Sequence, residues 1–230
     1  MALCVSTRLW LGGVVQKSRD KHLARALARL VHACARCAPL LFVTDGWVAY
    51  REAFHKAFRT KLYTGASPRL LAWPQRVLVQ TVKAYQKGRA VGVRECRLLG
   101  DWTQIGRLLP QAQEVSTAYI ERLNATFRQR LCCLVRRSRA LARLPETVQQ
   151  GMYLVGCVYN FCTPHQTLTK QARTPTTPAM AAGLTTQIWS VSTLLFYRLP
   201  PAPAKPKRRP GQSGRKRLSE AERRTRLATA

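Results

Sequence analysis

The stretch that decides the fold is Leu40-Leu41-Phe42-Val43-Thr44-Asp45-Gly46. It is a continuous apolar run that follows Pro39 and ends in an acid and a glycine. A run of this length between such residues predicts a strand that is buried on both faces of a sheet. The apolar residues within 47–58 recur at helical spacing and predict a helix of about three turns. Asp45 is therefore expected where a buried strand gives way to a helix.

Asp45 has two interpretations. The carboxyl ends of strands in open α/β sheets are where ligands and active sites collect, which makes this acid a candidate site residue. Asp is also a favoured N-cap residue, and the alternative is that Asp45 only caps the helix that follows it. The rest of the chain favours the first interpretation.

The charge balance points to a polyanionic partner. The 230 residues include 39 Lys and Arg but only 10 Asp and Glu, a net charge of +29. Such an excess is tolerated best where a polyanion neutralises it, so we expect DNA or RNA first and an anionic membrane surface second. No segment reaches the roughly 18 apolar residues of a membrane span, and the start lacks a signal-peptide pattern. We expect a cytoplasmic, nucleoid-associated protein with no membrane segment and no small-molecule substrate.

The first half of the chain predicts a mixed sheet. Residues 2–15 predict two strands around a turn at residues 6–8, and residues 20–36 carry an amphipathic helix pattern. Together with the stretch around Asp45 they give the order strand, strand, helix, strand, helix, which is typical of a mixed α/β sheet. The eight cysteines follow no disulfide framework, and we expect reduced, mostly buried thiols.

Residues 59–115 predict an inserted, partly β subdomain with a basic face. No acid occurs from Ala53 through Arg94, and β-prone pieces at 76–82 and 90–99 alternate with Gly and Pro. Two explanations remain open for the aromatic residues in this block. They supply stacking surfaces for nucleic acid bases, or they are packed aromatics on an ordinary solvated face. The cations are Arg59, Lys61, Arg69, Arg76, Lys83, Lys87, Arg89 and Arg94.

The second half predicts helices and a tail. Ser116 or Thr117 is expected to cap a helix that runs to about Arg139, and a second helix is expected over residues 146–161. We expect a turn at 159–168, an extended segment at 174–183, and an apolar patch at 188–199 that packs back on the body. Residues 199–230 predict a disordered basic tail, which leaves 1–198 as the folded domain.

Several motifs in this order resemble the catalytic core of insertion-sequence transposases of the DDE class. The resemblance covers roughly residues 2–198 and implies an RNase H-like fold, which retroviral integrases share. The motifs are Thr44-Asp45-Gly46 with Tyr50, Ala118-Tyr119-Ile120-Glu121-Arg122-Leu123-Asn124-Ala125-Thr126-Phe127-Arg128, Tyr159-Asn160-Phe161 with Pro164-His165, Arg173-Thr174-Pro175, and Pro178-Ala179-Met180-Ala181.

The resemblance implies cleavage and strand transfer of DNA phosphodiesters at transposon ends and target, with two Mg²⁺ or Mn²⁺ ions held by three carboxylates. It makes Asp45 the second acid and Glu121 the third. Asn124 and Arg128 share a helix face with Glu121 and would support it or contact the DNA backbone. Supporting or DNA-binding roles are also expected for Arg122, Lys83, Arg89 and His165, and for His165 the alternative is a structural role.

The chain departs from the family at the first acid, which should stand on a strand upstream of Asp45. Asp20 is the only acid between Met1 and Asp45, and it is expected to open a helix instead. We therefore expect a sheet without its first strand, in a truncated transposase whose two remaining ligands do not fix both ions. The alternatives are a noncatalytic DNA-binding relic that interferes with full-length relatives, and an RNA-associated basic protein. A homodimer is compatible with the class.

Cys34 and Cys37, with His32 nearby, are the one rival metal motif. A structural zinc site normally needs a second pair of ligands, and Cys34 and Cys37 are expected one turn apart at the end of a helix. We therefore expect no zinc.

Overall fold

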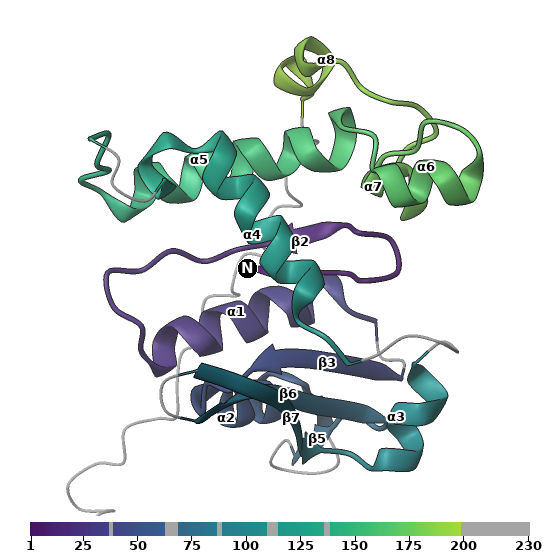
Figure 1. Ribbon diagram of the computed structural model, residues 1–230. Helices are drawn as coiled ribbons and strands as arrows, with labels where there is room; N and C mark the ends of the chain where they lie inside the picture. Colours follow the sequence, from purple (N-terminus) through teal and green to yellow (C-terminus); the bar gives the residue numbers. More distant parts are fainter. Residues whose placement is uncertain (37–38, 63–68, 87–88, 110–114, 136–138, 199–230) are drawn as a thin grey trace, which may run out of the picture. The chain divides into compact units, whose positions relative to one another are not determined.

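The computed structural model describes residues 1–36, 39–62, 69–86, 89–109, 115–135 and 139–198 (Figure 1). Contacts divide the chain into a compact unit, Met1–Phe196, and a second unit, Tyr197–Ala230. The first unit is mixed α/β, as predicted, with helices and small sheets. The predicted disordered tail, residues 199–230, lies outside the described residues.

The chain begins with a short hairpin followed by a helix, in the predicted order. Strands β1 (Ala2–Leu3) and β2 (Trp10–Gly12) pair antiparallel. Helix α1 (Lys21–Cys34) begins after Asp20, whose carboxylate accepts hydrogen bonds from the backbone N–H groups of His22 and Leu23 at 2.9 and 3.0 Å. The role predicted for Asp20, that of opening a helix, is confirmed.

The stretch around Asp45 forms strand β3 (Leu40–Asp45), but the prediction that it is buried on both faces is wrong. Residues 40–44 are only half-buried. Strand β3 pairs in parallel with β6 (Arg76–Gln86), and β6 pairs antiparallel with β7 (Arg89–Leu99), which gives the order β3-β6-β7. Within the described residues β3 thus has a neighbour on one side only, and the middle strand β6 carries the fully buried Val77, Leu78 and Val79.

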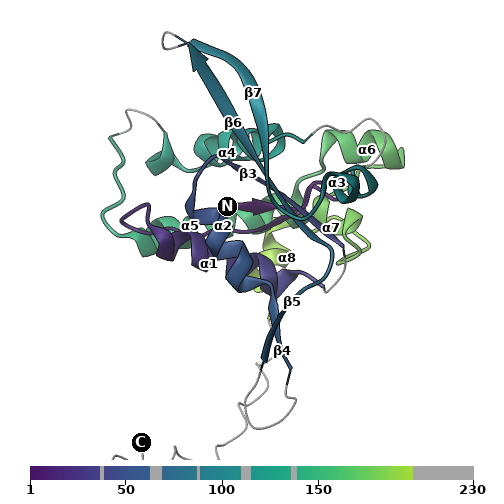
Figure 2. The same cartoon turned by 90° about the horizontal axis from the view of Figure 1, so that it is seen from below.

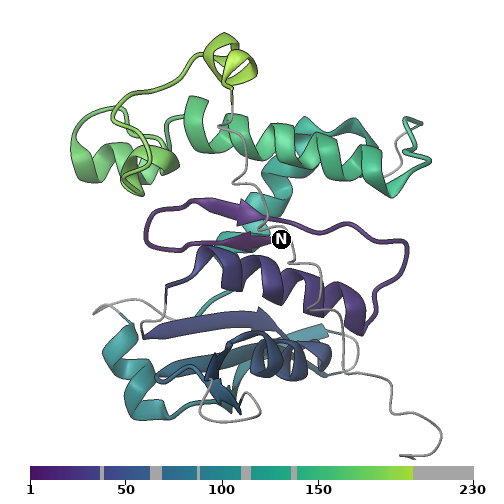
Figure 3. The same cartoon turned by 180° about the vertical axis from the view of Figure 1, so that it is seen from behind.

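Helices cover both faces of this sheet (Figure 3). Helices α1 and α2 (Ala49–Ala57) lie on one face, where Ala28, Phe54 and Phe58 pack with Leu78. The helix predicted after Asp45 is thus confirmed. Helix α3 (Trp102–Leu108) lies on the other face and packs Ile105 with Val77 and Val79.

The block predicted as an insertion, residues 59–115, is β-rich, but its middle belongs to the main sheet. Strands β4 (Arg59–Leu62) and β5 (Arg69–Ala72) form a separate two-stranded sheet. Strand β6, in contrast, is the central strand beside β3, because its residues 76–81 pair with residues 40–45. Beyond Thr81, β6 and β7 continue as a two-stranded ribbon (Figure 2).

The second half is helical; the helix predicted over 146–161 is confirmed, whereas the one predicted to end near Arg139 is shorter. Helix α4 (Ala118–Arg130) ends well before the predicted Arg139, and a 3-10 turn, Cys132–Leu134, follows it. Cysteine and valine are weak helix formers, which explains why the pattern does not continue through Cys132, Cys133 and Val135. Helix α5 (Pro145–Cys157) continues into a π-helical turn, Val158–Cys162.

Three short helices follow: α6 (Gln166–Ala172), α7 (Pro178–Ala181) and α8 (Val191–Phe196). The prediction of an extended segment over 174–183 is wrong at α7, which Thr177 caps by accepting a hydrogen bond from the Met180 N–H at 3.3 Å. In the described part of the predicted apolar patch at 188–199, Trp189 packs back on the body, with its ring 4.8 Å from that of Phe161, and Leu194 is half-buried. The exposed Leu195 and Phe196 do not take part in this packing.

A second core joins the hairpin to the later helices. Trp10, Phe127, Met152 and Tyr159 pack together with Leu123. Asn160 fastens the contact because its side chain bonds both the N–H and the carbonyl of Trp10, each at 2.9 Å.

The thiols are free in the described part of the chain, but they are not mostly buried as predicted. Cys34 and Cys132 are exposed, and the other five described cysteines are half-buried. The two exposed thiols lie in the last turn of α1 and in the 3-10 turn, where fewer neighbours cover them. Of the helices described, none combines the length and the apolar character that crossing a membrane requires.

Candidate nucleic-acid and metal site

Asp45 is the last residue of β3, and its side chain is 58% exposed. Its carboxylate forms an ion pair with Arg19 at 3.2 Å and accepts a hydrogen bond from the Trp47 N–H at 3.3 Å. Helix α2 begins only at Ala49, after an N-cap residue, Val48, that has no side-chain capping bond. The alternative that Asp45 serves as the N-cap is therefore wrong, and its carboxylate stands free of the helix end.

Glu121 lies in the first turn of α4, with its side chain 57% exposed. The Thr117 hydroxyl donates to its Oε1 at 3.1 Å. The Lys83 ammonium, which comes from β6, lies 4.0 Å from the same oxygen. Glu121 therefore lies beside a basic side chain of the middle strand.

Strand β6 connects the two carboxylates. Asp45 pairs with Thr81 in the parallel register, and Lys83 follows Thr81 by two residues. Side chains two residues apart on a strand point to the same face. Asp45, Lys83 and Glu121 therefore belong to one side of the sheet at the carboxyl end of β3. Each acid has a basic partner, Arg19 for Asp45 and Lys83 for Glu121.

The donor set does not match two divalent ions. Across the described residues, no three His, Cys, Asp or Glu side chains form a group that could hold a metal. Asp20 is engaged at the start of α1. Cys34 is exposed at the end of α1, and its expected companion Cys37 lies outside the described residues. Two carboxylates that already face cations supply too little negative charge and too few oxygens for a two-ion site.

The other predicted site residues fall into three places. Asn124, half-buried, and Arg128, exposed, follow Glu121 along one face of α4. Arg89 lies at the far end of the β6–β7 ribbon, opposite Gln86. Arg122 lies on a different side of α4 and meets His165 in a pocket.

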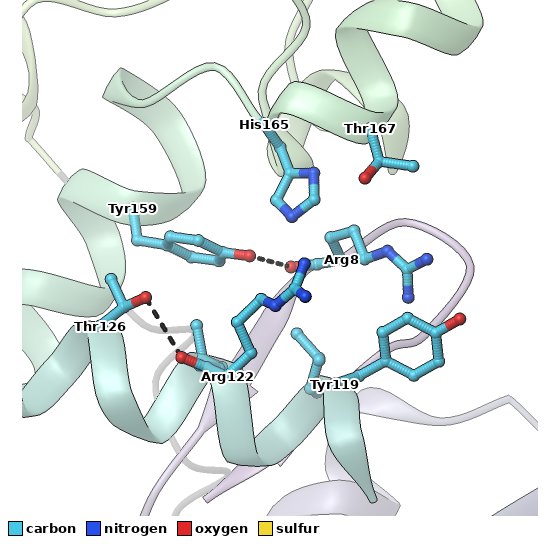
Figure 4. A pocket seen from close by; sticks show the side chains of 9 residues that line it. Arg8, Tyr119, Arg122, Thr126, Tyr159, His165 and Thr167 are labelled. Atoms are coloured by element: carbon cyan, nitrogen blue, oxygen red, sulfur yellow. Dashed lines mark hydrogen bonds between the residues drawn. The ribbon is translucent and has the colours of Figure 1, made fainter. Parts of the chain in front are cut away.

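This pocket has a volume of about 120 Å³ and lies between the hairpin, α4 and the segment around His165 (Figure 4). Arg8, Arg122 and His165 reach into it, as does Thr167. Tyrosine rings form two of its sides (Figure 4). The full set of lining residues is Leu3, Arg8, Tyr119, Arg122, Leu123, Thr126, Tyr159, His165 and Thr167.

Arg8 is the pocket residue that the sequence did not indicate. Its backbone has a φ of 58°, a left-handed conformation that is uncommon for a residue other than glycine. The Tyr159 hydroxyl donates to the Arg8 carbonyl at 3.1 Å, and the Arg8 guanidinium lies 3.9 Å from the centre of the Tyr119 ring. A lone arginine in a short hairpin turn gives no sequence signal, because its direction depends on packing between distant segments.

The positive charges that line the pocket act on the pKa of His165. Burial lowers the pKa of His165 below its usual value, and the positive charges of Arg8 and Arg122 lower it further. The backbone of His165 is fixed, since its N–H donates to the Thr176 carbonyl at 2.9 Å and its carbonyl accepts from the Thr169 N–H at 2.9 Å. The imidazole is therefore held in a field that favours a negative partner.

The chain matches no protein-family model, and comparison with curated proteins and with solved structures gives no match. The resemblance described above therefore rests on the quoted motifs alone.

Proposed function

We propose that this chain is a DNA-binding member of the DDE transposase class whose catalytic site is incomplete within these residues. The observation that carries the proposal is that Asp45 and Glu121 are both linked to the same stretch of β6, Asp45 through its pairing with Thr81 and Glu121 through Lys83. The two acids lie 76 positions apart in sequence, yet both belong to the carboxyl end of β3 through Thr81 and Lys83. This is the edge at which α/β proteins place their ligands.

The topology supports an RNase H-like assignment. A hairpin, a helix, a strand and a second helix lead to a parallel partner strand, and helices cover both faces of that parallel pair. The sheets β1-β2 and β3-β6-β7 are separate. An RNase H-like sheet lacking its first strand would be divided in this way, because that strand would pair with both parts.

The two carboxylates account for the expected loss of catalysis. In-line cleavage of a phosphodiester by two metal ions needs ligands that position both the attacking and the leaving oxygen. Asp45 and Glu121 alone do not provide them, and Asp20 is occupied as a helix cap. We therefore expect this chain to bind DNA and not to cleave it.

The β6–β7 ribbon is the surface that we assign to DNA. A two-stranded ribbon fits the major groove of B-DNA. Beyond Thr81 it carries Lys83, Arg89 and Arg94, with a single acid, Glu95, opposite Thr81. Binding of this kind neutralises phosphates and releases counterions, so its affinity falls steeply with salt.

Binding to a DNA duplex at several salt concentrations, together with nicking of supercoiled DNA in Mg²⁺ or Mn²⁺, tests the proposal. If about six phosphates are contacted, affinity should fall on the order of a thousandfold between about 50 and 200 mM salt. Asp45→Ala and Glu121→Ala should retain this binding, and neither they nor the unaltered chain should nick. Nicking that requires both acids would overturn the proposed incompleteness.

A competition with RNA of equal length separates DNA from RNA as the partner. Preference for DNA is expected, and a clear preference for RNA would contradict the assignment. The transposase lineage further implies binding to transposon ends and target DNA in the nucleoid, in the cytoplasm, and is compatible with a homodimer.

A further inference from the structure

The pocket between the hairpin and α4 gathers positive charge that no acid offsets. Arg8 and Arg122 supply two guanidinium groups, and His165 adds an imidazole (Figure 4). No Asp or Glu belongs to its described lining. The contrast with Asp45 and Glu121 is direct, because each of those acids already faces a cation.

Two of the residues that line the pocket each have a buried polar atom without a hydrogen-bond partner in the described residues. These atoms are Nη1 of Arg8 and Nδ1 of His165. Buried polar atoms are nearly always hydrogen-bonded, and an unpartnered one indicates strain or a missing water or ion. Leaving a charged group without a partner is especially costly. Four such atoms occur among the described residues, and the other two, Trp10 Nε1 and Thr44 Oγ1, belong to residues that do not line this pocket. Two of the four thus belong to residues of one pocket, which favours a ligand there that accepts hydrogen bonds.

We propose that this pocket binds one phosphate group. A guanidinium presents a planar fork of donors that matches two phosphate oxygens. Arg8 and Arg122 each bring one such fork to the lining of this pocket. The Thr167 hydroxyl and a protonated His165 would add donors to the remaining oxygens. The volume of about 120 Å³ is well above the roughly 10–15 Å³ that a single water needs.

Arg8 is prepared for this role before any ligand arrives. Its left-handed backbone, the hydrogen bond from Tyr159 and the contact with the Tyr119 ring fix its position. Backbone strain of this kind concentrates at functional sites. A fixed arginine loses little side-chain entropy when it binds, which favours affinity.

The phosphate could belong to a nucleic acid backbone or to a free anion, and the chemistry is the same for both. The site does not depend on the proposed DNA binding, since inorganic phosphate tests it alone. If a duplex produces the same effect, then the pocket receives a backbone phosphate and deepens the proposed function.

Inorganic phosphate titrated into the full chain, with the imidazole signal of His165 followed by NMR, is the first test. Of the four histidines in the chain, only His165 lines the pocket. Phosphate should shift this signal to saturation and raise the pKa of His165, because an anion favours the charged imidazole. Apparent affinity should therefore increase as pH falls through the range in which His165 protonates. Arg8, Arg122, Tyr119 and Tyr159 are the other charged or titratable groups that line its surroundings.

Arg122→Gln and Arg8→Gln should each weaken phosphate binding by about tenfold or more, the effect of losing charge-assisted hydrogen bonds. Arg122 is exposed, so its variant tests the site even if Arg8→Gln fails to fold. The matched control is Arg107→Gln, an exposed position on α3 with the same change of charge, which should bind phosphate normally.

A duplex oligonucleotide without terminal phosphates forms the second arm. A phosphate-dependent shift that Arg122→Gln weakens and Arg107→Gln preserves supports the site, and the duplex then shows whether its source is a DNA backbone. No shift at high millimolar phosphate, or equal shifts in both variants, overturns it. Failure of the duplex to bind anywhere on the chain would overturn the proposed function and leave the phosphate site standing.

Discussion

Two regions of the molecule collect charged side chains but differ in whether those charges are paired. The carboxylate edge is formed by Asp45, Glu121, Arg19 and Lys83. The cationic pocket is formed by Arg8, Arg122 and His165. At the edge, both acids are more than half exposed and are matched by basic side chains. In the pocket, two cations and an imidazole meet without an acid, and two of their nitrogens have no partner among the described residues.

This difference separates a site whose charges are already paired from one that still offers unpaired donors. Exposed ion pairs contribute little to the free energy of folding, because water stabilises the separated charges almost as well as their pairing does. Buried donors without acceptors cost free energy until something binds them. The two regions share helix α4, because Glu121 contacts Lys83 at the carboxylate edge and the next residue, Arg122, lines the pocket.

The largest effect is expected from Asn160→Ala, which should loosen the hairpin that carries the pocket residue Arg8. Asn160 holds the backbone of Trp10 through two buried hydrogen bonds. Losing both should lower the free energy of unfolding by about 2–4 kcal/mol and weaken phosphate binding. Chemical denaturation measures the loss. Gln150→Ala removes an exposed amide on α5 and should change stability by less than about 0.5 kcal/mol. Equal losses in the two variants would contradict the role of Asn160.

The carboxylate edge can be made to resemble a metal site by removing its cations. Each basic partner near an acid contributes about 1 kcal/mol of repulsion toward a bound cation in water. Arg19→Ala combined with Lys83→Ala should therefore raise Mn²⁺ affinity several-fold, as measured by paramagnetic broadening of signals around Asp45 and Glu121. Arg107→Ala should leave the affinity unchanged. A double variant that binds no better would show that the acids do not share one ion.

The pocket should also make stability depend on pH. The pKa of His165 is lower in the folded chain than in the unfolded chain, so the unfolded state binds more protons between the two values. The contribution of neutral His165 to the free energy of unfolding is fully present above the ordinary histidine pKa of about 6.5. It is lost as pH falls through the lower pKa of the folded state. Denaturation of the unaltered chain and of His165→Gln across this range should show a smaller loss in the variant. Saturating phosphate should reduce the loss, and an unchanged pH profile would count against the electropositive pocket.

The smallest effect is expected at the edge itself. Lys83→Met keeps the length of the side chain and removes its contact with Glu121, a pair whose side chains are each more than half exposed. Such pairs contribute about 0–1 kcal/mol, so the melting temperature should hardly change. DNA affinity should fall modestly, because one ribbon cation is lost. A large loss of stability would show that the pair supports the sheet, and the contrast with the pocket would then fail.

The positions of the helices and strands follow from the sequence better than their burial and their ends do. The run 40–45 is a strand and the residues after it form a helix, as predicted, because apolar periodicity is a local property. The burial expected for β3 belongs to β6, since burial follows from the order of strands in a sheet, which no single strand encodes. The end of α4 and the short α7 were missed because weak propensities are decided by capping and packing.

The sequence by itself determined the charge of +29, the strand that ends in Asp45, the cap at Asp20 and the helix that carries Glu121. Composition, apolar spacing and capping residues act within a few positions of the chain, which is why they can be interpreted without coordinates. The tertiary structure alone decided that Lys83 lies beside Glu121 and that Arg8, Arg122 and His165 line one pocket. Arg8 and His165 are 157 positions apart in the sequence, and the packing of the hairpin against the later helices brings them to the same pocket.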